Sequence, residues 1–371
     1  MKATGIVVEY NPFHNGHEYH IQKTKEITNC DVLIGVMSGN FVQRGEPAIL
    51  DKWKRAEVAI KHGVDLIIEL PYIYATQSAS NFAQGSIRCL EIAQVSDIVF
   101  GSETNNIEEL KEMAASCIHV DNLKESLSIG HSFPKAYGLL AKEMGPNDIL
   151  GVSYLKAIMN TKITAHTIQR TVHYHDEEMH NEIASATAIR KAIHENKPLA
   201  NTTCMNEELS QNELVQLKDF YPYLRLLLST LPPKELASIF LISEGIENHL
   251  IKQALLSSTY EEFINNAVTR RYTTSRIRRC CLQILNHITK EDVKNLPPLD
   301  TIRILAFNDK GREYLRQLQE NEVKVASKFS QIPLAYRKME YKTSLLYTTC
   351  MREEQRQSLL KQEIGSPLYI K

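Results

Sequence analysis

The first half of the chain alternates short apolar runs with longer amphipathic runs. The short runs predict strands at Thr4–Glu9, Asp31–Met37, Asp65–Leu70 and Asp97–Phe100. Between them, apolar residues recur at three- and four-residue spacing, which predicts helices at His17–Thr28, Lys52–His62 and Ala79–Gln94. Strands that alternate with crossover helices indicate a doubly wound α/β domain with a parallel sheet, of the Rossmann-like kind.

The pattern changes after residue 196. Before that point, Asn147–Ile158 and Ile163–Thr171 continue the α/β domain, and Ile183–Glu195 predicts a capped helix. Between residues 207 and 289 the apolar positions have a helical period, with prolines as breaks. We therefore expect an α/β domain over residues 1–200 and a mainly helical domain over residues 201–371. A late strand at Val323–Phe329 and a final helix at Arg352–Glu363 are also expected.

Composition narrows the class of protein. The 371 residues are 43% hydrophobic and 23% charged, which is typical of a globular protein and excludes a single small binding domain. The net charge of -1 gives no overall signal for nucleic acid or membrane. No apolar run is long enough to cross a membrane, and no signal peptide is evident. The seven cysteines lack C-x-x-C spacing, so we expect a reduced, cytoplasmic protein without a structural zinc site.

The most informative sequence follows the first predicted strand. In parallel sheets, ligands bind beyond the carboxyl ends of the strands, which here are followed by Tyr10–Gly16, Ser38–Pro47 and a loop that begins at Gly101. The first loop ends in His14-Asn15-Gly16-His17, at the start of a helix. Two imidazoles on a helix N-terminus suit an anion, and Gly16 permits close approach. The pattern favours ATP phosphates and reaction at the α-phosphate.

Histidines at this spacing also occur as ordinary helix residues, but their place after the first strand favours the nucleotide site. The tetrapeptide resembles the H-x-G-H signature of the nucleotidyltransferase superfamily. A second segment, Ser185-Ala186-Thr187-Ala188-Ile189-Arg190, resembles the S-x-T-x-I-R motif that closes the same site in that superfamily. Taken alone it is an N-cap followed by a surface arginine. Its hydroxyls, free amides and guanidinium also suit an anion.

The resemblance extends to a narrower family. The stretches Val7–His20, Met37–Ala48, Gly63–Tyr72, Phe100–Glu103 and Ile183–Lys191 together resemble the bacterial tRNA(Met) cytidine acetate ligase family. That resemblance implies an enzyme that activates acetate with ATP as acetyl-adenylate and releases pyrophosphate. The acetyl group then passes to the wobble cytidine of elongator tRNA(Met), in the anticodon loop, to give N4-acetylcytidine.

The resemblance also implies a set of site residues. His14 and His17 would be catalytic and would face the phosphates. The ATP site would consist of Val7, Val8, Glu9, Tyr10, Asn11, Pro12, Phe13, His14, Asn15, Gly16, His17, Glu18, Tyr19, His20, Gly101, Asn147, Arg170, Thr171, Ser185, Thr187 and Arg190.

The loop after the second strand offers candidates for the acetate or phosphate contacts. Gln43 and Arg44 provide an amide and a cation there. An alternative is that Arg44 only forms a surface ion pair with Glu46. Mg²⁺ is expected to accompany ATP, and the phosphates would supply most of its ligands. Glu69 and Glu103 end strands on this edge, but we assign no metal ligand.

A basic cluster in the second half suits RNA. Its arginines are Arg270, Arg271, Arg276, Arg278 and Arg279, close to Tyr272 and several hydroxyl groups. Arginine binds phosphate and tyrosine stacks on an unpaired base, so the cluster is a candidate tRNA-binding surface. Without the family resemblance, a solvated helix face is an equal interpretation.

Two other functions remain open at this stage. A small-molecule adenylyltransferase would share both motifs but would need neither the second domain nor the arginine cluster. A non-catalytic tRNA-binding protein would bind ATP without turnover, and the intact His14 and His17 argue against it. The sequence leaves the oligomeric state open.

Overall fold

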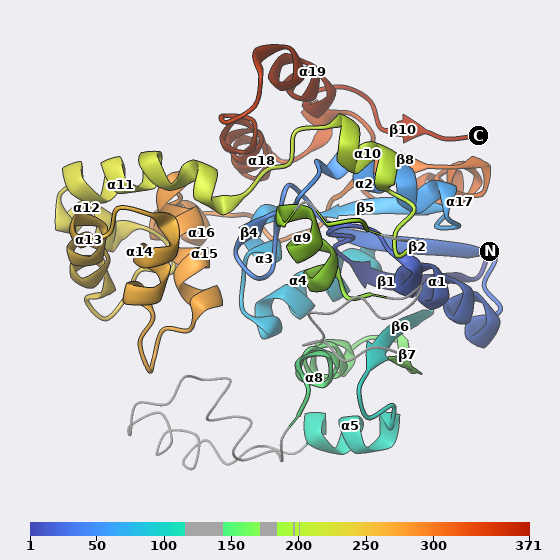
Figure 1. The fold of residues 1–371 in the computed structure, drawn as a ribbon. Helices are drawn as coiled ribbons and strands as arrows, with labels where there is room; N and C mark the ends of the chain where they lie inside the picture. Colours follow the sequence, from blue (N-terminus) through green and yellow to red (C-terminus); the bar gives the residue numbers. More distant parts are fainter. Residues whose placement is uncertain (116–143, 171–183, 196, 200) are drawn as a thin grey trace.

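A computed structural model describes residues 1–115, 144–170, 184–195, 197–199 and 201–371 (Figure 1). Its centre is a mostly parallel sheet with the strand order β10-β8-β5-β2-β1-β6-β7, and β9 pairs with β8. The strands are β1 (Ala3–Val8), β2 (Val32–Ser38), β5 (Leu66–Leu70), β6 (Asp97–Ser102), β7 (Thr164–Gln169), β8 (Ile302–Phe307), β9 (Val325–Ala326) and β10 (Leu368–Tyr369). A separate antiparallel hairpin consists of β3 (Phe41–Val42) and β4 (Glu46–Pro47). The predicted α/β fold class is confirmed.

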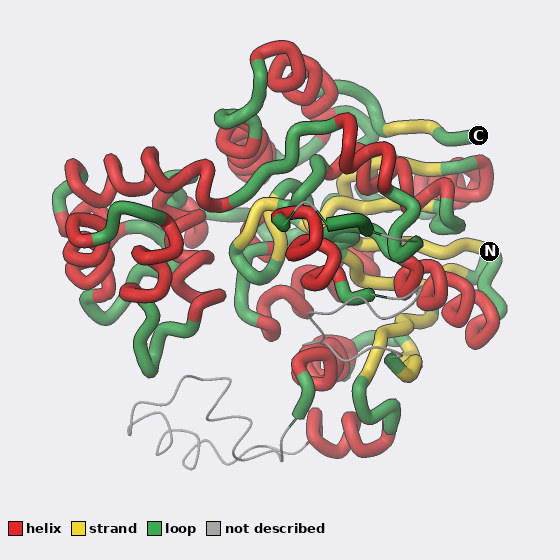
Figure 2. Tube along the Cα trace, viewed as in Figure 1, coloured by secondary structure: helices red, strands yellow, loops and turns green. Residues whose placement is uncertain are grey.

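Helices cover both faces of this sheet (Figure 2). Along β2, Ile34 and Val36 belong to the core on one face, whereas Leu33 and Met37 belong to the core on the other. Successive side chains of a strand point to opposite faces, so an entirely apolar strand is buried on both sides. The first core includes residues of α3 (Tyr72–Ala75), α4 (Ala79–Ile92), α5 (Ile107–Ala115), α8 (Pro146–Ile158), α17 (Asp309–Glu320) and α18 (Leu334–Tyr347). The second includes residues of α1 (Asn15–Thr28), α2 (Lys52–Lys61) and α10 (Asn206–Gln211).

A helical module, residues 221–285, has a core of its own. It consists of α11 (Tyr221–Thr230), α12 (Pro233–Ser238), α13 (Ile246–Leu256), α14 (Tyr260–Ala267) and α15 (Thr274–Leu285). The short segments η1 (Leu217–Phe220) and α16 (Lys290–Lys294) flank it, and the module lies to one side of the sheet (Figure 1). Among the described residues, no helix has both the length and the apolar character needed to cross a membrane.

The second half of the chain is not one helical unit, which corrects the division expected at residue 200. After the helical module the chain returns to the sheet, where β8 lies antiparallel to β5. Ile304 of β8 belongs to one core of the sheet and Leu305 to the other. The expected strand at Val323–Phe329 is only the two-residue β9, followed by η2 (Phe329–Gln331), and the expected last helix is α19 (Glu353–Glu363). Residues 302–369 therefore complete the α/β domain.

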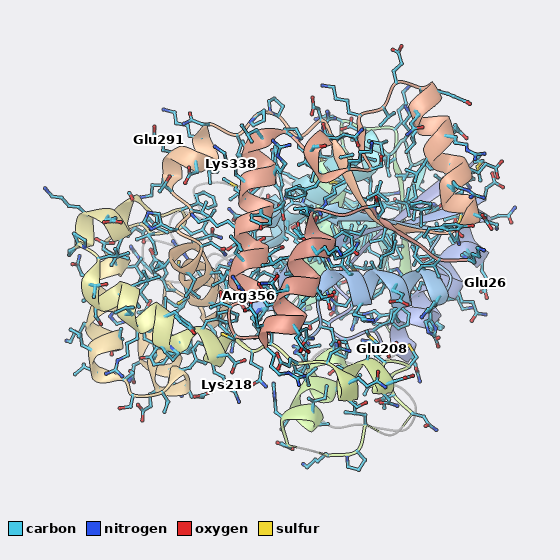
Figure 3. The ribbon with its side chains drawn as sticks, turned by 90° about the horizontal axis from the view of Figure 1, so that it is seen from above. Glu26, Glu208, Lys218, Glu291, Lys338 and Arg356 are labelled. Atoms are coloured by element: carbon cyan, nitrogen blue, oxygen red, sulfur yellow. The ribbon has the colours of Figure 1, made fainter. Side chains whose placement is uncertain are left out.

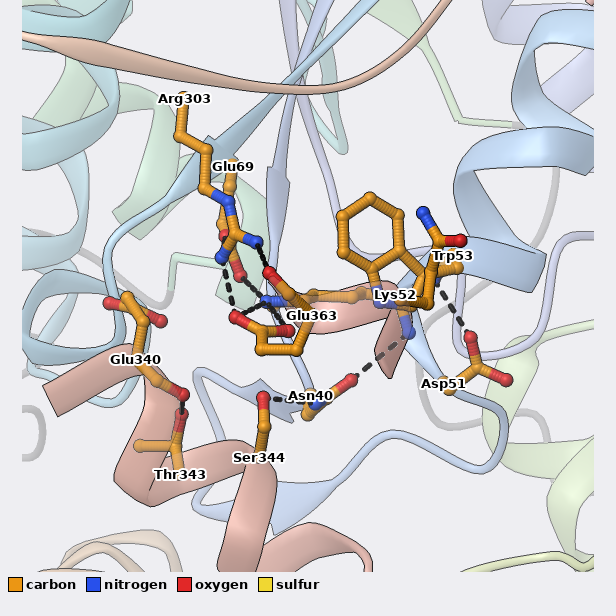
Figure 4. A network of polar contacts seen from close by, with 12 residues as sticks. Asn40, Asp51, Lys52, Trp53, Glu69, Arg303, Glu340, Thr343, Ser344 and Glu363 are labelled. Carbon is orange, nitrogen blue, oxygen red and sulfur yellow. Dashed lines mark hydrogen bonds and ion pairs between the residues drawn. The ribbon is translucent and has the colours of Figure 1, made fainter. Parts of the chain in front are cut away.

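A buried ion cluster holds this returning segment in place (Figure 4). Lys52 Nζ lies 2.6 Å from Glu69 Oε1 and 2.8 Å from Glu363 Oε2. Arg303 Nη1 lies 2.7 Å from Glu69 Oε2 and 2.6 Å from Glu363 Oε1. The four side chains come from α2, β5, β8 and α19, so the cluster joins the first part of the sheet to the end of the chain. Other charged side chains, such as Glu26, Glu291 and Lys338, are exposed at the periphery (Figure 3).

Candidate active site

The two histidines of the first motif form the N-terminal cap of α1. His14 has an extended backbone conformation, and its Nδ1 accepts a hydrogen bond from the backbone N–H of Gly16 at 3.1 Å. The backbone N–H of His14 in turn donates to His17 Nδ1 at 3.2 Å. This is a reciprocal capping box in which imidazoles take the place of the usual hydroxyl and carboxylate. The sequence His-Asn-Gly-His therefore starts the helix at Asn15.

The same hydrogen bonds fix the tautomer of both rings. A neutral imidazole has one donor nitrogen and one acceptor nitrogen. Because Nδ1 accepts a backbone N–H in His14 and in His17, the proton of each neutral ring must be on Nε2. The rings stack with their centroids 3.7 Å apart, and both line the same cavity. The site thus offers two Nε2–H donors beside the first turn of a helix, where anions bind favourably.

Burial keeps these imidazoles neutral. Burial, together with the charges of Arg170 and Arg190, lowers the pKa of His14 to about 3. The pKa of His17 is also well below its ordinary value, mainly through burial and then through His14. His20 follows on the next turn, and burial lowers its pKa to about 4 although its Nε2 donates to the carbonyl of Val99. At neutral pH the three rings act as hydrogen-bond donors, and the arginines supply the positive charge.

The second motif reaches the same site from α9 (Ala186–His194). Ser185 is the N-cap of α9, and its hydroxyl accepts a hydrogen bond from the backbone N–H of Ala188 at 3.0 Å. One turn later, Arg190 Nη1 donates to the carbonyl of Asn11 at 2.7 Å. This contact ties the start of α9 to the loop before His14. The two motifs, far apart in the sequence, therefore form one site.

A third side of the site comes from β6, β7 and α8. Arg170 follows β7, and its Nη1 lies 3.4 Å from Asn147 Oδ1 on the first turn of α8. Gly101 lies at the end of β6, where an added Cβ would be 3.2 Å from Arg170 Cγ. A side chain at position 101 would press on the arginine, so glycine there leaves Arg170 in place.

These elements enclose a cavity of about 330 Å³, a size typical of small-ligand sites. The predicted residues that line it are Val7, Val8, Glu9, Tyr10, Asn11, His14, Gly16, His17, Tyr19, His20, Gln43, Arg44, Gly101, Asn147, Arg170, Ser185, Thr187 and Arg190. The lining combines cations and N–H donors with the aromatic side chains of Phe82, Phe100 and Tyr154. Such a cavity can hold phosphates and a flat, partly apolar group together.

Comparison with known proteins places the chain in a family. The family model for HIGH nucleotidyl transferases matches residues 1–363. The tRNA(Met) cytidine acetate ligase of Geobacillus sp. (strain WCH70) is 36% identical and the match covers 99% of each chain. The protein of the same name from Caldicellulosiruptor saccharolyticus is 41% identical over 86% of each chain. The chain belongs to the tRNA(Met) cytidine acetate ligase family.

Two solved structures of the family agree with the fold. The apo crystal structure of Thermotoga maritima TmcAL, form I, has a TM-score of 0.89 and 32% identity, and the match covers 100% of both chains. A second structure of that protein, bound with alpha-thio ATP, has a TM-score of 0.88 and 31% identity. The match therefore includes the α/β domain, the helical module and the returning strand β8.

Some residues predicted for the ligase site lie outside the cavity lining. These are Pro12, Phe13, Asn15 and Glu18, and Thr171 is outside the described residues. Phe13 is fully buried and packs against the ring of His17, with centroids 5.5 Å apart. Glu18 pairs with His62, the C-cap residue of α2. Phe13 and Glu18 therefore support the loop and the helix that carry the two histidines.

The aromatic walls formed by Phe82, Phe100 and Tyr154 are not among the site residues predicted from the sequence. Asn147, Leu150 and Tyr154 are spaced three and four residues apart on α8, so they share one face of that helix. This spacing was visible in the sequence. Phe82 is different, because only the packing of α4 against the sheet brings it to the cavity.

The arginine cluster divides into two groups. Arg270 and Arg271 are exposed, and the Arg276 guanidinium lies 3.8 Å from the centre of the Tyr272 ring. Tyr272 is buried, and its hydroxyl donates to the carbonyl of Ser243 at 2.7 Å, so its ring is used inside the helical module. The prediction that this tyrosine is placed to stack on a base is therefore not supported.

Arg278 and Arg279 face the α/β domain instead of solvent. Arg278 Nη1 pairs with Glu46 of β4, and Arg279 Nη1 donates to the carbonyl of Gln43 at 3.2 Å. Burial lowers the pKa of Arg279 to about 10. Between these contacts Gly45 approaches α15 so closely that an added Cβ would lie 2.5 Å from the backbone nitrogen of Arg279. The two arginines join the helical module to the hairpin of the cavity, which makes them unsuitable as free RNA contacts.

The same contacts settle the role of Glu46. Its Oε1 pairs with Arg278, and its Oε2 lies 4.0 Å from Arg190 Nη2. Gln43 Nε2 donates to the carbonyl of Gln77 at 3.0 Å, and both Gln43 and Arg44 line the cavity.

The donors for a metal ion are sparse. Within the described part of the chain, no group of three or more His, Cys, Asp or Glu residues is arranged to hold a metal ion. Glu9 and Glu46 are the carboxylates among the described residues of the cavity lining. This donor set fits a Mg²⁺ ion that arrives with ATP and takes its ligands from phosphate and water.

Proposed function

We propose that this chain activates acetate with ATP and transfers the acetyl group to the wobble cytidine of elongator tRNA(Met), giving N4-acetylcytidine. Curated relatives that match nearly the full chain carry the name tRNA(Met) cytidine acetate ligase. The observation that carries the proposal is the stacked pair His14 and His17, whose Nε2–H groups lie in one cavity with Arg170 and Arg190.

In the first half-reaction, an acetate oxygen attacks the α-phosphorus of ATP. The bond to the bridging oxygen breaks, and pyrophosphate leaves with the negative charge. His14, His17 and the amides of the first turn of α1 would stabilise that charge without a covalent enzyme intermediate. Because both rings are neutral before reaction, they donate hydrogen bonds, and they need not gain or lose a proton. Mg²⁺ bound to the phosphates would neutralise further charge.

In the second half-reaction, the exocyclic amine of cytidine attacks the acetyl carbonyl and AMP leaves. An anticodon base is unpaired, so it can enter a cavity without the cost of opening a duplex. Gln43 and Arg44 line the cavity on the hairpin side, next to the helical module. We assign to them the acetate or its activated carbonyl. A tRNA substrate also implies that the reaction takes place in the cytoplasm.

The tRNA contacts are assigned to the outward-facing arginines. Arg270 and Arg271 are exposed, and Arg276 is partly exposed on the same helical module. These arginines belong to the helical module that contacts the hairpin of the cavity, and arginine suits the phosphates of an anticodon stem or loop. Arg278 and Arg279 take part indirectly, because they fix the module against the hairpin of the cavity.

The proposal is tested by incubating the pure protein with ATP, Mg²⁺, labelled acetate and bulk bacterial tRNA, and by analysing the digested nucleosides by mass. We expect acetylcytidine only when ATP and acetate are both present. Transfer of the adenylyl group to a small acceptor would favour an adenylyltransferase. Binding of ATP and tRNA without turnover would favour a non-catalytic RNA-binding protein. Either result would contradict the proposal.

A further inference from the structure

A carboxylate at the end of β1 faces the cavity with one oxygen anchored. Glu9 follows β1 directly, and its Oε1 accepts hydrogen bonds from the backbone N–H of Gln43 at 2.7 Å and from Ser38 Oγ at 3.4 Å. Among the described residues, Glu9 Oε2 accepts no hydrogen bond. Glu9 lines the cavity. The anchored oxygen therefore fixes the carboxylate, and the other oxygen is available to a ligand.

A carboxylate here is unexpected in a cavity for two anions. ATP and acetate are both negatively charged, so an ionised Glu9 opposes their binding, and its place in the cavity calls for a role in another step. The ionisable groups that face it are Arg55 of α2, Arg44 of the hairpin, Arg190 of α9 and Tyr154 of α8. Arg55 Nη1 also donates to the backbone carbonyl of Glu9 at 2.5 Å. Burial raises the pKa of Glu9 and the arginines partly offset this, which leaves a carboxylate more basic than a surface glutamate.

The acetyl transfer step needs a base. The lone pair of the cytosine amine is delocalised into the ring, so the amine is a weak nucleophile and must lose a proton as it bonds to carbon. His14 and His17 are poorly suited, because their low pKa values make them weak bases and each Nδ1 already accepts a backbone N–H. The second carboxylate of the described cavity lining, Glu46, is paired with Arg278. Glu9 remains as the cavity-lining carboxylate with one oxygen, Oε2, that accepts no hydrogen bond from the described residues.

We propose that Glu9 is the general base of the acetyl transfer step. Its Oε2 accepts a proton from N4 of cytidine as the bond between N4 and the acetyl carbon forms. The bond between that carbon and the oxygen of AMP then breaks, and AMP leaves with the electron pair. The proton passes from Glu9 to water when the products leave. This inference rests on the proposed function and adds a residue to its second half-reaction.

The test separates the two half-reactions in Glu9→Gln. The amide keeps the size of the side chain and an oxygen for the N–H of Gln43, but it cannot take up the proton. Acetate-dependent exchange of labelled pyrophosphate into ATP reports the first half-reaction without tRNA. Single-turnover acetylation of tRNA reports the second. We expect the transfer rate to fall by about 100-fold or more, and the exchange rate, which also senses the lost charge in the cavity, to change far less than the transfer rate.

Conservative and matched variants complete the test. Glu9→Asp keeps a carboxylate and should recover part of the transfer rate. Glu26→Gln makes the same chemical change at an exposed position of α1 and should leave both half-reactions unchanged. The wild-type transfer rate should rise with pH until Glu9 is ionised and then level off, whereas the residual rate of Glu9→Gln should lack that rise.

Failure of this inference and failure of the proposed function give different results. If the wild type supports acetate-dependent exchange and transfer but Glu9→Gln transfers at the wild-type rate, Glu9 is not the base. An equal loss of exchange and transfer in Glu9→Gln, with Glu9→Asp no better, would also overturn the role. If the wild type supports neither half-reaction, the proposed function itself is wrong and the base assignment falls with it.

Discussion

His14 caps the helix that carries His17, and the two imidazole rings stack with their centroids 3.7 Å apart. The hydrogen bonds that start α1 are also those that place a proton on Nε2 of each ring. Local folding and chemistry therefore use the same atoms. A substitution at His14 affects both, and the choice of the new residue can separate them.

His14→Asn should keep the N-terminal cap of α1 but lose the Nε2–H donor that faces the cavity. Asparagine is among the best N-cap residues, whereas alanine at this position costs about 1 kcal/mol. We expect His14→Asn to unfold at nearly the wild-type temperature but to lose about 100-fold or more in turnover, with tRNA binding unchanged. His14→Ala should lose stability as well. Thermal unfolding, acetylation kinetics and tRNA binding check this, and wild-type turnover in His14→Asn would remove His14 from the mechanism.

The buried histidines should make the protein sensitive to mild acid. The pKa of His20 is about 4 in the folded protein and 6.5 ordinarily, so below pH 6.5 the unfolded chain binds the proton first. The contribution to stability is complete above pH 6.5 and is lost as the pH falls towards 4, by up to about 1.4 kcal/mol per pH unit for each histidine. In urea unfolding, the free energy of unfolding should fall less steeply between pH 7 and 5 in His20→Gln than in the wild type. Parallel curves for the two proteins would contradict the buried, neutral state of His20.

The outward-facing arginines should act on tRNA binding alone. Replacing Arg270, Arg271 and Arg276 together by alanine should weaken tRNA binding and lower its dependence on salt by about one unit of slope per lost phosphate contact. Acetate-dependent pyrophosphate exchange, which needs no tRNA, should be unchanged. A matched control replaces Lys310, Arg312 and Arg316 of α17, which are exposed on the sheet domain. Equal weakening of tRNA binding by both triple variants would reject the assigned surface.

Gly45→Ala should loosen the helical module from the hairpin. Gly45 has a φ of 79°, and an added Cβ would lie 2.5 Å from the backbone nitrogen of Arg279. Gly245 is a matched control, because its φ is 78° but an added Cβ would meet nothing within 4 Å. Gly245→Ala should therefore lower the free energy of unfolding by only about 1 kcal/mol, the conformational cost of alanine at this φ. Gly45→Ala should lower it by clearly more. Equal losses of unfolding free energy would show that the close approach to α15 contributes nothing.

For Glu340 we expect the opposite pH dependence from His20, because its contribution to stability is lost as the pH rises. It lies beside the buried ion cluster of two cations and two carboxylates, and its Oε1 accepts a hydrogen bond from the N–H of Tyr72 at 2.8 Å. Burial, with the charge of Glu69, raises its pKa to about 8. The folded protein therefore holds this proton, and that contribution to stability is lost as the pH rises towards 8.

Glu340→Gln should be more stable than the wild type at high pH. The amide keeps an acceptor for the Tyr72 N–H and has no proton to lose. The difference in unfolding free energy between variant and wild type should grow by more than about 1 kcal/mol between pH 5 and 8. A difference that stays constant over this range would mean that Glu340 is already ionised in the folded protein.

Local features of the site could be predicted from the sequence. The first strand, the His14–His17 cap and the capped helix that carries Arg190 depend on neighbours within a few residues, and the structure has all of them. The position of β8 could not be predicted. Its six residues follow a long helical stretch, and only the pairing with β5 and the ion pair of Arg303 with Glu69 show where they belong.

Contacts between distant segments were likewise invisible. Arg276 and Arg278 look alike in the sequence, but Arg276 stacks on Tyr272 while Arg278 meets Glu46, more than two hundred residues away. In the sequence, Glu9 is only one residue of a long motif. Its role becomes apparent only from the structure, where the N–H of Gln43 fixes one of its oxygens. Such roles depend on tertiary packing, which the residue pattern of a single helix or loop does not encode.

The oxygen atoms of acetate reveal which phosphorus of ATP is attacked. If an acetate oxygen attacks the α-phosphorus, that oxygen stays on phosphorus when the amine attacks the carbonyl. With ¹⁸O-labelled acetate, ATP and tRNA, attack at the α-phosphorus gives AMP that carries one labelled oxygen for each acetylcytidine formed. Labelled inorganic phosphate together with ADP would show attack at the γ-phosphate, and it would contradict the role assigned to His14 and His17.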